Sequence, residues 1–169
     1  MVATKDKNFS KFYSKEDIIN FDKHYYSASR ISLATFIEEA IEQYKKENKG
    51  VYPKNIIIYR QGIAHNYLNK IELEVLKIQE ICKKFDIHYY YVLVNTRTTI
   101  KFFEYNIINP KNGSTQKYKN PKQGLIILDQ ITNLNRFEFF IQPQLVNIGS
   151  ATPTYFHVVM EIWYFQKNC

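Results

Sequence analysis

The chain has 169 residues, of which 45% are hydrophobic, a composition that excludes a disordered protein and a length that predicts a single domain over residues 1–169. The 23 Lys and Arg exceed the 16 Asp and Glu by seven charges, which favours an anionic partner but does not by itself decide for nucleic acid. Two cysteines and the lack of any long apolar run exclude a disulfide framework and a membrane span, and predict an intracellular protein of the cytoplasm or nucleus.

The N-terminal residues predict a β-hairpin. Val2–Thr4 and Lys11–Tyr13 have strand composition, and the turn-forming segment Asp6-Lys7-Asn8 lies between them. The next segment, Glu16–Ser29, is polar and poorly patterned, so we expect a loop there, with a short helical or strand piece as the alternative.

A helix is the clearest local prediction. Apolar side chains recur at helical spacing from Leu33 to Tyr44, with Ser32 placed as a possible N-cap and Gly50 as a stop. The apolar run of Asn55–Tyr59 follows, and its unbroken β-branched residues predict a strand that is covered on both faces.

A second helix and further strands complete the pattern. Residues Tyr67–Lys84 carry an apolar stripe through Ile71, Val75, Ile78 and Cys82, and predict a helix that leads into a central strand. Helix–strand–helix–strand order favours a right-handed crossover in an α/β fold. The predicted strands after this helix are His88–Val94, Ile100–Ile108, Gly124–Asp129, Phe137–Ile141 and Tyr155–Trp163, with a loop at Asn109–Ser114.

Four short motifs occur in order along the chain. They are Pro53-x-x-Ile56-Ile57-Ile58-Tyr59-Arg60-x-Gly62-Ile63, Thr96-Arg97-x-x-x-Lys101-Phe102-Phe103, Pro121-x-x-Gly124 and Gly149-Ser150-x-Thr152-Pro153-Thr154-Tyr155-Phe156-His157. In this order they resemble the PIWI domain of the Argonaute/Piwi family. The resemblance implies an α/β fold, an RNase H-like mixed sheet flanked by helices, that binds a small guide RNA and its target RNA in gene silencing.

The same resemblance implies a partial domain. The family's first strand, which carries its first catalytic Asp, would lie upstream of Met1, so we expect the sheet to lack that strand. An unpaired sheet edge would then be left beside hydrophobic residues, where a protein partner could cover it.

The family's catalytic positions are not intact in this sequence. Gln61 replaces the Asp of Arg-Asp-Gly, and Tyr155 replaces the His of Pro-Thr-His-Tyr. The assisting Glu aligns loosely to Ser27 or Ala28, and His157 is more simply a half-buried strand residue than a substitute ligand. Because a neutral amide cannot supply the charge of a carboxylate to Mg²⁺, we predict no metal site, no cofactor and no cleavage.

Binding residues are better preserved. Arg97 and Lys101 match the segment that presents basic side chains to the nucleic-acid backbone, and Ser150, Thr152 and Thr154 lie in a loop that the resemblance places along the guide. Without the resemblance, these residues are also consistent with solvated cations and a Pro-containing surface loop. The lysine-rich segment Lys117–Lys122 is more typical of a solvated loop than of a basic binding surface.

Two other functions remain open. One is a metal-dependent RNA endonuclease whose missing ligands come from a partner chain. The other is a protein-interaction module without RNA affinity, which uses the exposed sheet edge. Divalent-ion-dependent cleavage would identify the first, and a salt-independent protein complex would identify the second.

Overall fold

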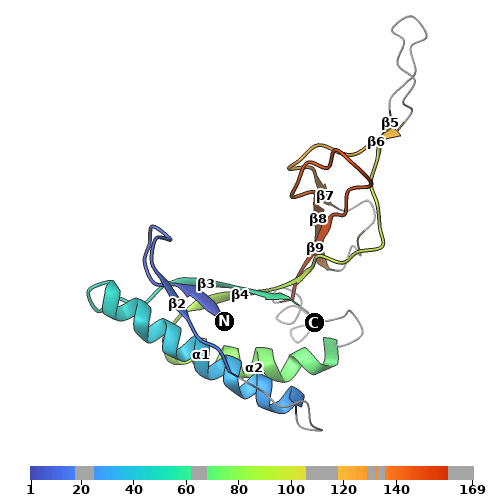
Figure 1. Cartoon of the computed structure of the whole chain (residues 1–169). Helices are drawn as coiled ribbons and strands as arrows, with labels where there is room; N and C mark the ends of the chain where they lie inside the picture. The colour runs from blue at the N-terminus through green and yellow to red at the C-terminus, as the bar shows by residue number, and fades with distance from the viewer. Residues whose placement is uncertain (18–24, 62–67, 106–117, 129–131, 133–135, 160–169) are drawn as a thin grey trace, which may run out of the picture. The chain divides into compact units, whose positions relative to one another are not determined.

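The computed structural model describes residues 1–17, 25–61, 68–105, 118–128, 132 and 136–159 (Figure 1). Two helices and nine strands are formed by these residues: β1 (Val2–Thr4), β2 (Phe12–Ser14), α1 (Tyr25–Glu47), β3 (Asn55–Gln61), α2 (Leu68–Lys84), β4 (His88–Asn95), β5 (Glu104–Tyr105), β6 (Tyr118–Lys119), β7 (Ile126–Leu128), β8 (Phe137–Ile141) and β9 (Thr154–Val158). Neither of these helices is long and apolar enough to cross a membrane.

The chain divides into two compact units. The first comprises residues 1–58 and 65–90, and the second comprises residues 59–64 and 91–169. Strands β3 and β4 each begin in the first unit and end in the second. One domain over residues 1–169 therefore stays a prediction.

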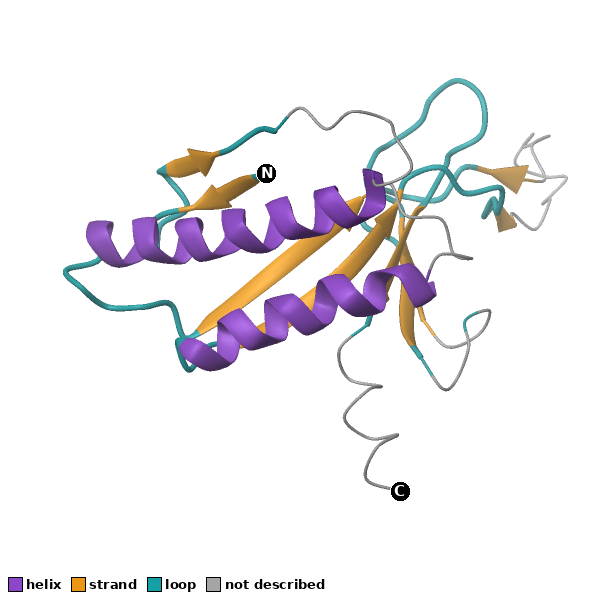
Figure 2. Ribbon diagram, turned by 90° about the horizontal axis from the view of Figure 1, so that it is seen from below, coloured by secondary structure: helices purple, strands orange, loops and turns teal. Residues whose placement is uncertain are grey.

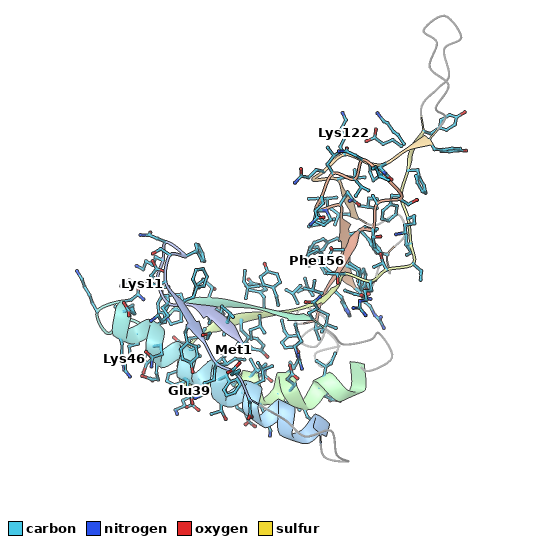
Figure 3. The ribbon with its side chains drawn as sticks, viewed as in Figure 1. Met1, Lys11, Glu39, Lys46, Lys122 and Phe156 are labelled. Atoms are coloured by element: carbon cyan, nitrogen blue, oxygen red, sulfur yellow. The ribbon has the colours of Figure 1, made fainter. Side chains whose placement is uncertain are left out.

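The predicted hairpin is present in the first unit. Strands β1 and β2 pair antiparallel with Ala3 opposite Tyr13, and β2 is shifted by one residue from the predicted strand. Asp6 organises the turn, because its Oδ1 accepts hydrogen bonds from the backbone N–H groups of Ser10 and Lys11 at 2.9 Å. The hairpin is tied to α1 by an ion pair at 2.7 Å between Lys11, which is labelled in Figure 3, and Glu47.

Helix α1 is longer than the sequence predicts. It begins at Tyr25, so the last five residues of the predicted loop Glu16–Ser29 are helical, which is the alternative that the sequence left open. Ser32 lies inside the helix instead of capping it. No Gly or Pro interrupts residues 25–32, which allows the helix to extend past its apolar stripe. The predicted stop is confirmed: the Gly50 N–H donates to the Lys45 carbonyl at 2.9 Å, and Lys49 and Gly50 both have positive φ.

The two helices pack against each other and lie on one face of β3 and β4 (Figure 2). Their predicted apolar stripes form the core of the first unit, with Ile37, Ile41, Ile71, Ile78 and Cys82 all buried. Helix α2 ends as α1 does, because Asp86 has positive φ and the Ile87 N–H donates to the Cys82 carbonyl at 2.9 Å.

Strand β3 differs from its prediction. It is an edge strand of the described five-stranded sheet, whose order is β3-β4-β9-β8-β7. The strand was expected to be covered on both faces, but Ile57 is 56% exposed and Tyr59 is 65% exposed. The helices cover only one face of the strand, so inward and outward residues alternate despite the unbroken apolar sequence.

The second unit is built on an antiparallel meander. Strand β9 pairs with β4 on one side and with β8 on the other, and β8 also pairs with β7. Phe156 of β9, labelled in Figure 3, stacks on Phe139 of β8 with the ring centres 5.0 Å apart, and joins the two strands. Strand β8 has the predicted bounds, whereas the predicted strand Ile100–Ile108 is reduced in the described residues to β5, and β6 was not predicted. The predicted loop Asn109–Ser114 lies outside the described residues.

Candidate nucleic-acid interface

Gln61 and Tyr155, the two positions that the resemblance assigns to catalysis, lie on β3 and β9, which are separated by β4 in the sheet. Gln61 is the last residue of β3, and its Nε2 donates to the hydroxyl of Thr96 at 3.1 Å. Thr96 directly follows β4, whose last residue, Asn95, is paired with Tyr155 of β9. Gln61 thus ties the end of β3 to the segment that follows β4.

Tyr155 is held by its neighbours on β8. Its ring lies 5.0 Å from that of Phe140, and its hydroxyl donates a hydrogen bond to Glu138. Burial raises the pKa of the Tyr155 hydroxyl, and the hydrogen bond to the Glu138 carboxylate raises it further. Tyr155 is therefore a neutral donor at physiological pH.

Glu138 is the centre of a buried polar cluster. Its Oε1 lies 3.7 Å from Nη1 of Arg136 and 4.0 Å from Nε2 of His157. His157 is opposite Glu138 in the β8–β9 ladder and is 4% exposed, so it is more buried than the half-buried residue that the sequence predicts.

These donors do not fit a Mg²⁺ site of the family's kind. The described positions supply an amide at Gln61 and a protonated phenol at Tyr155, whereas Mg²⁺ prefers charged oxygen ligands. Among the described residues, no three His, Cys, Asp or Glu side chains are grouped so that they could hold a metal ion. Only the backbone is described at Ser27 and Ala28, which lie in the first turn of α1.

The loop over residues 149–154 is anchored to the segment that follows β4. The Thr98 hydroxyl donates to the carbonyl of Pro153 at 3.0 Å, and the Lys101 ammonium donates to the hydroxyl of Thr152. Ala151 and Pro153 are buried, while Ser150 and Thr152 are exposed. The segment that contains Lys101 and the loop that contains Thr152 were predicted separately as binding segments, and the structure brings them together. Lys101, Ser150 and Thr152 are exposed to solvent.

The start of the same loop is held by Asn120, which the sequence reasoning missed. Nδ2 of Asn120 donates to the carbonyl oxygens of Val146 at 2.9 Å and Gly149 at 2.7 Å. Its Oδ1 accepts the Ala151 N–H at 2.9 Å. Its position directly before the Pro121 motif was the available signal, because an Asn beside Pro often organises a turn.

The remaining predicted nucleic-acid contacts to be placed are Arg97 and Thr154. Arg97 is exposed, and its backbone N–H donates to Oδ1 of Asn95 at 2.9 Å. Thr154 is half-buried in β9, opposite Ile141, and is therefore the least accessible of the five predicted contacts.

The lysine-rich segment contributes less positive charge than its sequence suggests. Lys119 pairs with Glu104 at 2.9 Å, and the same carboxylate accepts the backbone N–H of Lys122 at 3.2 Å. Lys117 lies outside the described residues. The pairing of Lys119 argues against a basic binding surface here. The prediction of a loop is wrong at Tyr118 and Lys119, which form β6 because they pair with β5.

Comparison with known proteins gives a consistent result. A family model described as the Piwi domain matches residues 1–168. Protein argonaute-3 of Drosophila melanogaster is 30% identical over 168 residues, which are 95% of this chain and 17% of the fly protein. Piwi-like protein Siwi of Bombyx mori is 28% identical over 94% of this chain and 17% of its own length.

Solved structures agree with the sequence relatives. The crystal structure of Kluyveromyces polysporus Argonaute with a guide RNA superposes with a TM-score of 0.67 at 21% identity, and covers 99% of this chain and 22% of the yeast protein. This likeness confirms the predicted RNase H-like fold.

Proposed function

Because this chain belongs to the Piwi domain family of the Argonaute proteins, we propose that it binds a guide RNA and a guide–target duplex in small-RNA-mediated silencing without cutting RNA. The chain spans 17% of the length of the fly relative. The proposal therefore concerns the activity of this segment, inside the cell, in either the cytoplasm or the nucleus.

The contact between Lys101 and Thr152 is the observation that carries the proposal. It joins a cation to an exposed loop hydroxyl, and Arg97 lies four residues before Lys101 on the same segment. Cations and small hydroxyls together suit a sugar–phosphate backbone, which they can bind without reading the bases. The net charge of +7 supports the same partner.

The absence of cleavage is proposed from the donor chemistry at Gln61 and Tyr155. In-line attack on a phosphodiester by two metal ions requires anionic ligands that bridge both ions. Neither an amide nor a neutral phenol meets this requirement, so these residues do not support a metal-dependent step.

RNA binding is tested by fluorescence anisotropy with a labelled single-stranded RNA and a guide–target duplex, across a salt series with DNA as competitor. The Arg97→Ala/Lys101→Ala variant should bind more weakly, with a salt slope reduced by about 0.7 per lost cation on single strands. The matched control, Lys7→Ala/Lys83→Ala, removes the same charge from exposed lysines of the first unit. No binding by the folded chain, or an equal loss in both variants, would contradict the proposal.

Cleavage is tested with the same RNAs in the presence of Mg²⁺ or Mn²⁺. We expect intact RNA at every time point. Products that need a divalent ion and disappear in Gln61→Ala would instead support a nuclease, with the missing ligands supplied by a partner chain.

A protein-interaction module is the second candidate, and the β3 edge favours it. Ile57 and Tyr59 are exposed on an edge strand of the described sheet, and such an edge can accept an extended strand from a protein partner. A stable protein complex that resists high salt and is lost in Ile57→Lys would support this function.

A further inference from the structure

Asn120 makes three hydrogen bonds to the backbone around residues 146–151, although the nearest of its partners is 26 residues away in sequence. Both donor hydrogens of its amide and its carbonyl oxygen are directed at this one segment. The side chain therefore bridges the residue before Pro121 to the loop that precedes β9.

We propose that Asn120 is a positioning residue for the 149–154 loop, and that it orients the loop for contact with the nucleic-acid backbone. The inference rests on the proposed RNA-binding function. Asn120 itself is half-buried and makes these three hydrogen bonds to the protein backbone, so its effect on binding is through the loop.

The neighbouring residues support this assignment. Pro121 is fully buried, which limits the movement of Asn120 relative to the rest of the second unit. Gly149 has a φ of 81°, and its carbonyl accepts a hydrogen bond from Nδ2 of Asn120. This hydrogen bond therefore holds the residue at which the backbone turns. Two residues later, Ala151 is 1% exposed, and its N–H is satisfied by Oδ1 of Asn120.

The loop consequently has two anchors. Asn120 holds Gly149 and Ala151, while Thr98 and Lys101 hold Pro153 and Thr152. Along the anchored loop, the exposed Ser150 and Thr152 alternate with the buried Ala151 and Pro153. Because a loop fixed at both ends loses less conformational entropy on binding, releasing the first anchor should weaken RNA binding.

The test uses the full chain with Asn120→Ala and a milder variant, Asn120→Ser, which keeps a hydroxyl. The matched control is Asn48→Ala in the first unit, because Nδ2 of Asn48 also donates to two carbonyl oxygens, those of Lys5 and Tyr44, each at 2.7 Å. RNA anisotropy across a salt series is measured together with amide hydrogen exchange at Ala151 by NMR.

For Asn120→Ala we expect about a tenfold loss of RNA affinity, the effect of about one hydrogen bond, at an unchanged salt slope because no charge is removed. Exchange at Ala151 should accelerate, Asn120→Ser should be intermediate, and Asn48→Ala should leave both readouts unchanged. A purely structural role would lower stability in the Asn120 and Asn48 variants alike without this selective loss of affinity.

Failure of the positioning inference can be distinguished from failure of the proposed function. If the wild-type chain binds RNA and Asn120→Ala binds within twofold of it, the positioning inference is wrong while the proposed function stands. If the folded wild-type chain does not bind RNA, the proposed function fails, and exchange at Ala151 alone decides whether Asn120 orders the loop. Unchanged exchange at Ala151 would overturn the inference in either case.

Discussion

Replacing Tyr155 by Phe tests whether this position is structural or chemical. The substitution removes only the hydroxyl that donates to Glu138, and it retains the ring that packs 5.0 Å from Phe140. No cavity is created, so the measured change in stability reports the hydrogen bond.

The expected cost follows from the surroundings of Glu138. This carboxylate is 7% exposed, and loss of a donor to a buried charged acceptor costs about 1–3 kcal/mol. Arg136 remains 3.7 Å away and partly compensates, so we place the loss in the free energy of unfolding at about 1–2 kcal/mol. RNA affinity should not change.

The assay is urea unfolding at neutral pH, followed by tyrosine fluorescence and far-UV circular dichroism. Tyr59→Phe serves as the control because Tyr59 is 65% exposed, and its change should stay within about 0.5 kcal/mol. If Tyr155→Phe is as neutral as Tyr59→Phe, the hydrogen bond to Glu138 does not stabilise the fold and the structural interpretation of Tyr155 fails.

The dependence on pH gives a second readout of the same bond. The folded state raises the pKa of Tyr155 above the ordinary value of 10.0, so the folded chain holds this proton more tightly than the unfolded chain. The resulting stabilisation is complete below pH 10 and is lost as the pH rises further. The decline in stability above pH 10 should therefore be smaller in Tyr155→Phe than in the wild type.

Two further predictions concern the core of the first unit. Ile78→Ala should lower the free energy of unfolding by about 2–5 kcal/mol, because the Ile78 side chain is 0% exposed. Leu73 is 55% exposed on the same helix, so Leu73→Ala should change the free energy of unfolding little. Equal effects of the two substitutions in thermal melts would contradict the assigned helix face. Burial raises the pKa of the Cys82 thiol to about 11. In a Cys169→Ser variant, Cys82 should therefore resist a thiol reagent at about pH 8 until urea unfolds the chain. Rapid labelling of the folded chain would refute the burial of Cys82.

Local chemistry accounts for the predictions that the structure confirmed. The helix stop near Gly50 and the stripe through Ile78 depend on spacing and on backbone preference within one element, and both can be read without knowing the fold. The bounds of α1 could not be read in this way. Its first turns have no apolar stripe, and their helical conformation is not signalled by periodicity.

Contacts between distant segments account for the site interactions that the sequence did not predict. Asn120 meets Ala151 across 31 residues, and no local pattern records that pairing. The same is true of the hydrogen bond between Tyr155 and Glu138, which requires β8 and β9 to be neighbours in register. The sequence identified Tyr155 by its place in a motif but not the partner that explains it.

The order of helices and strands, their periodicity and the four ordered motifs were therefore determined by the sequence itself, because each depends on residues that are close together along the chain. The exposure of Ile57, the burial of His157 and the contact between Lys101 and Thr152 were decided only by the tertiary structure. The physical reason is that a strand's sequence specifies which residues share a face, whereas pairing and packing against distant segments decide which face is covered and which polar groups meet.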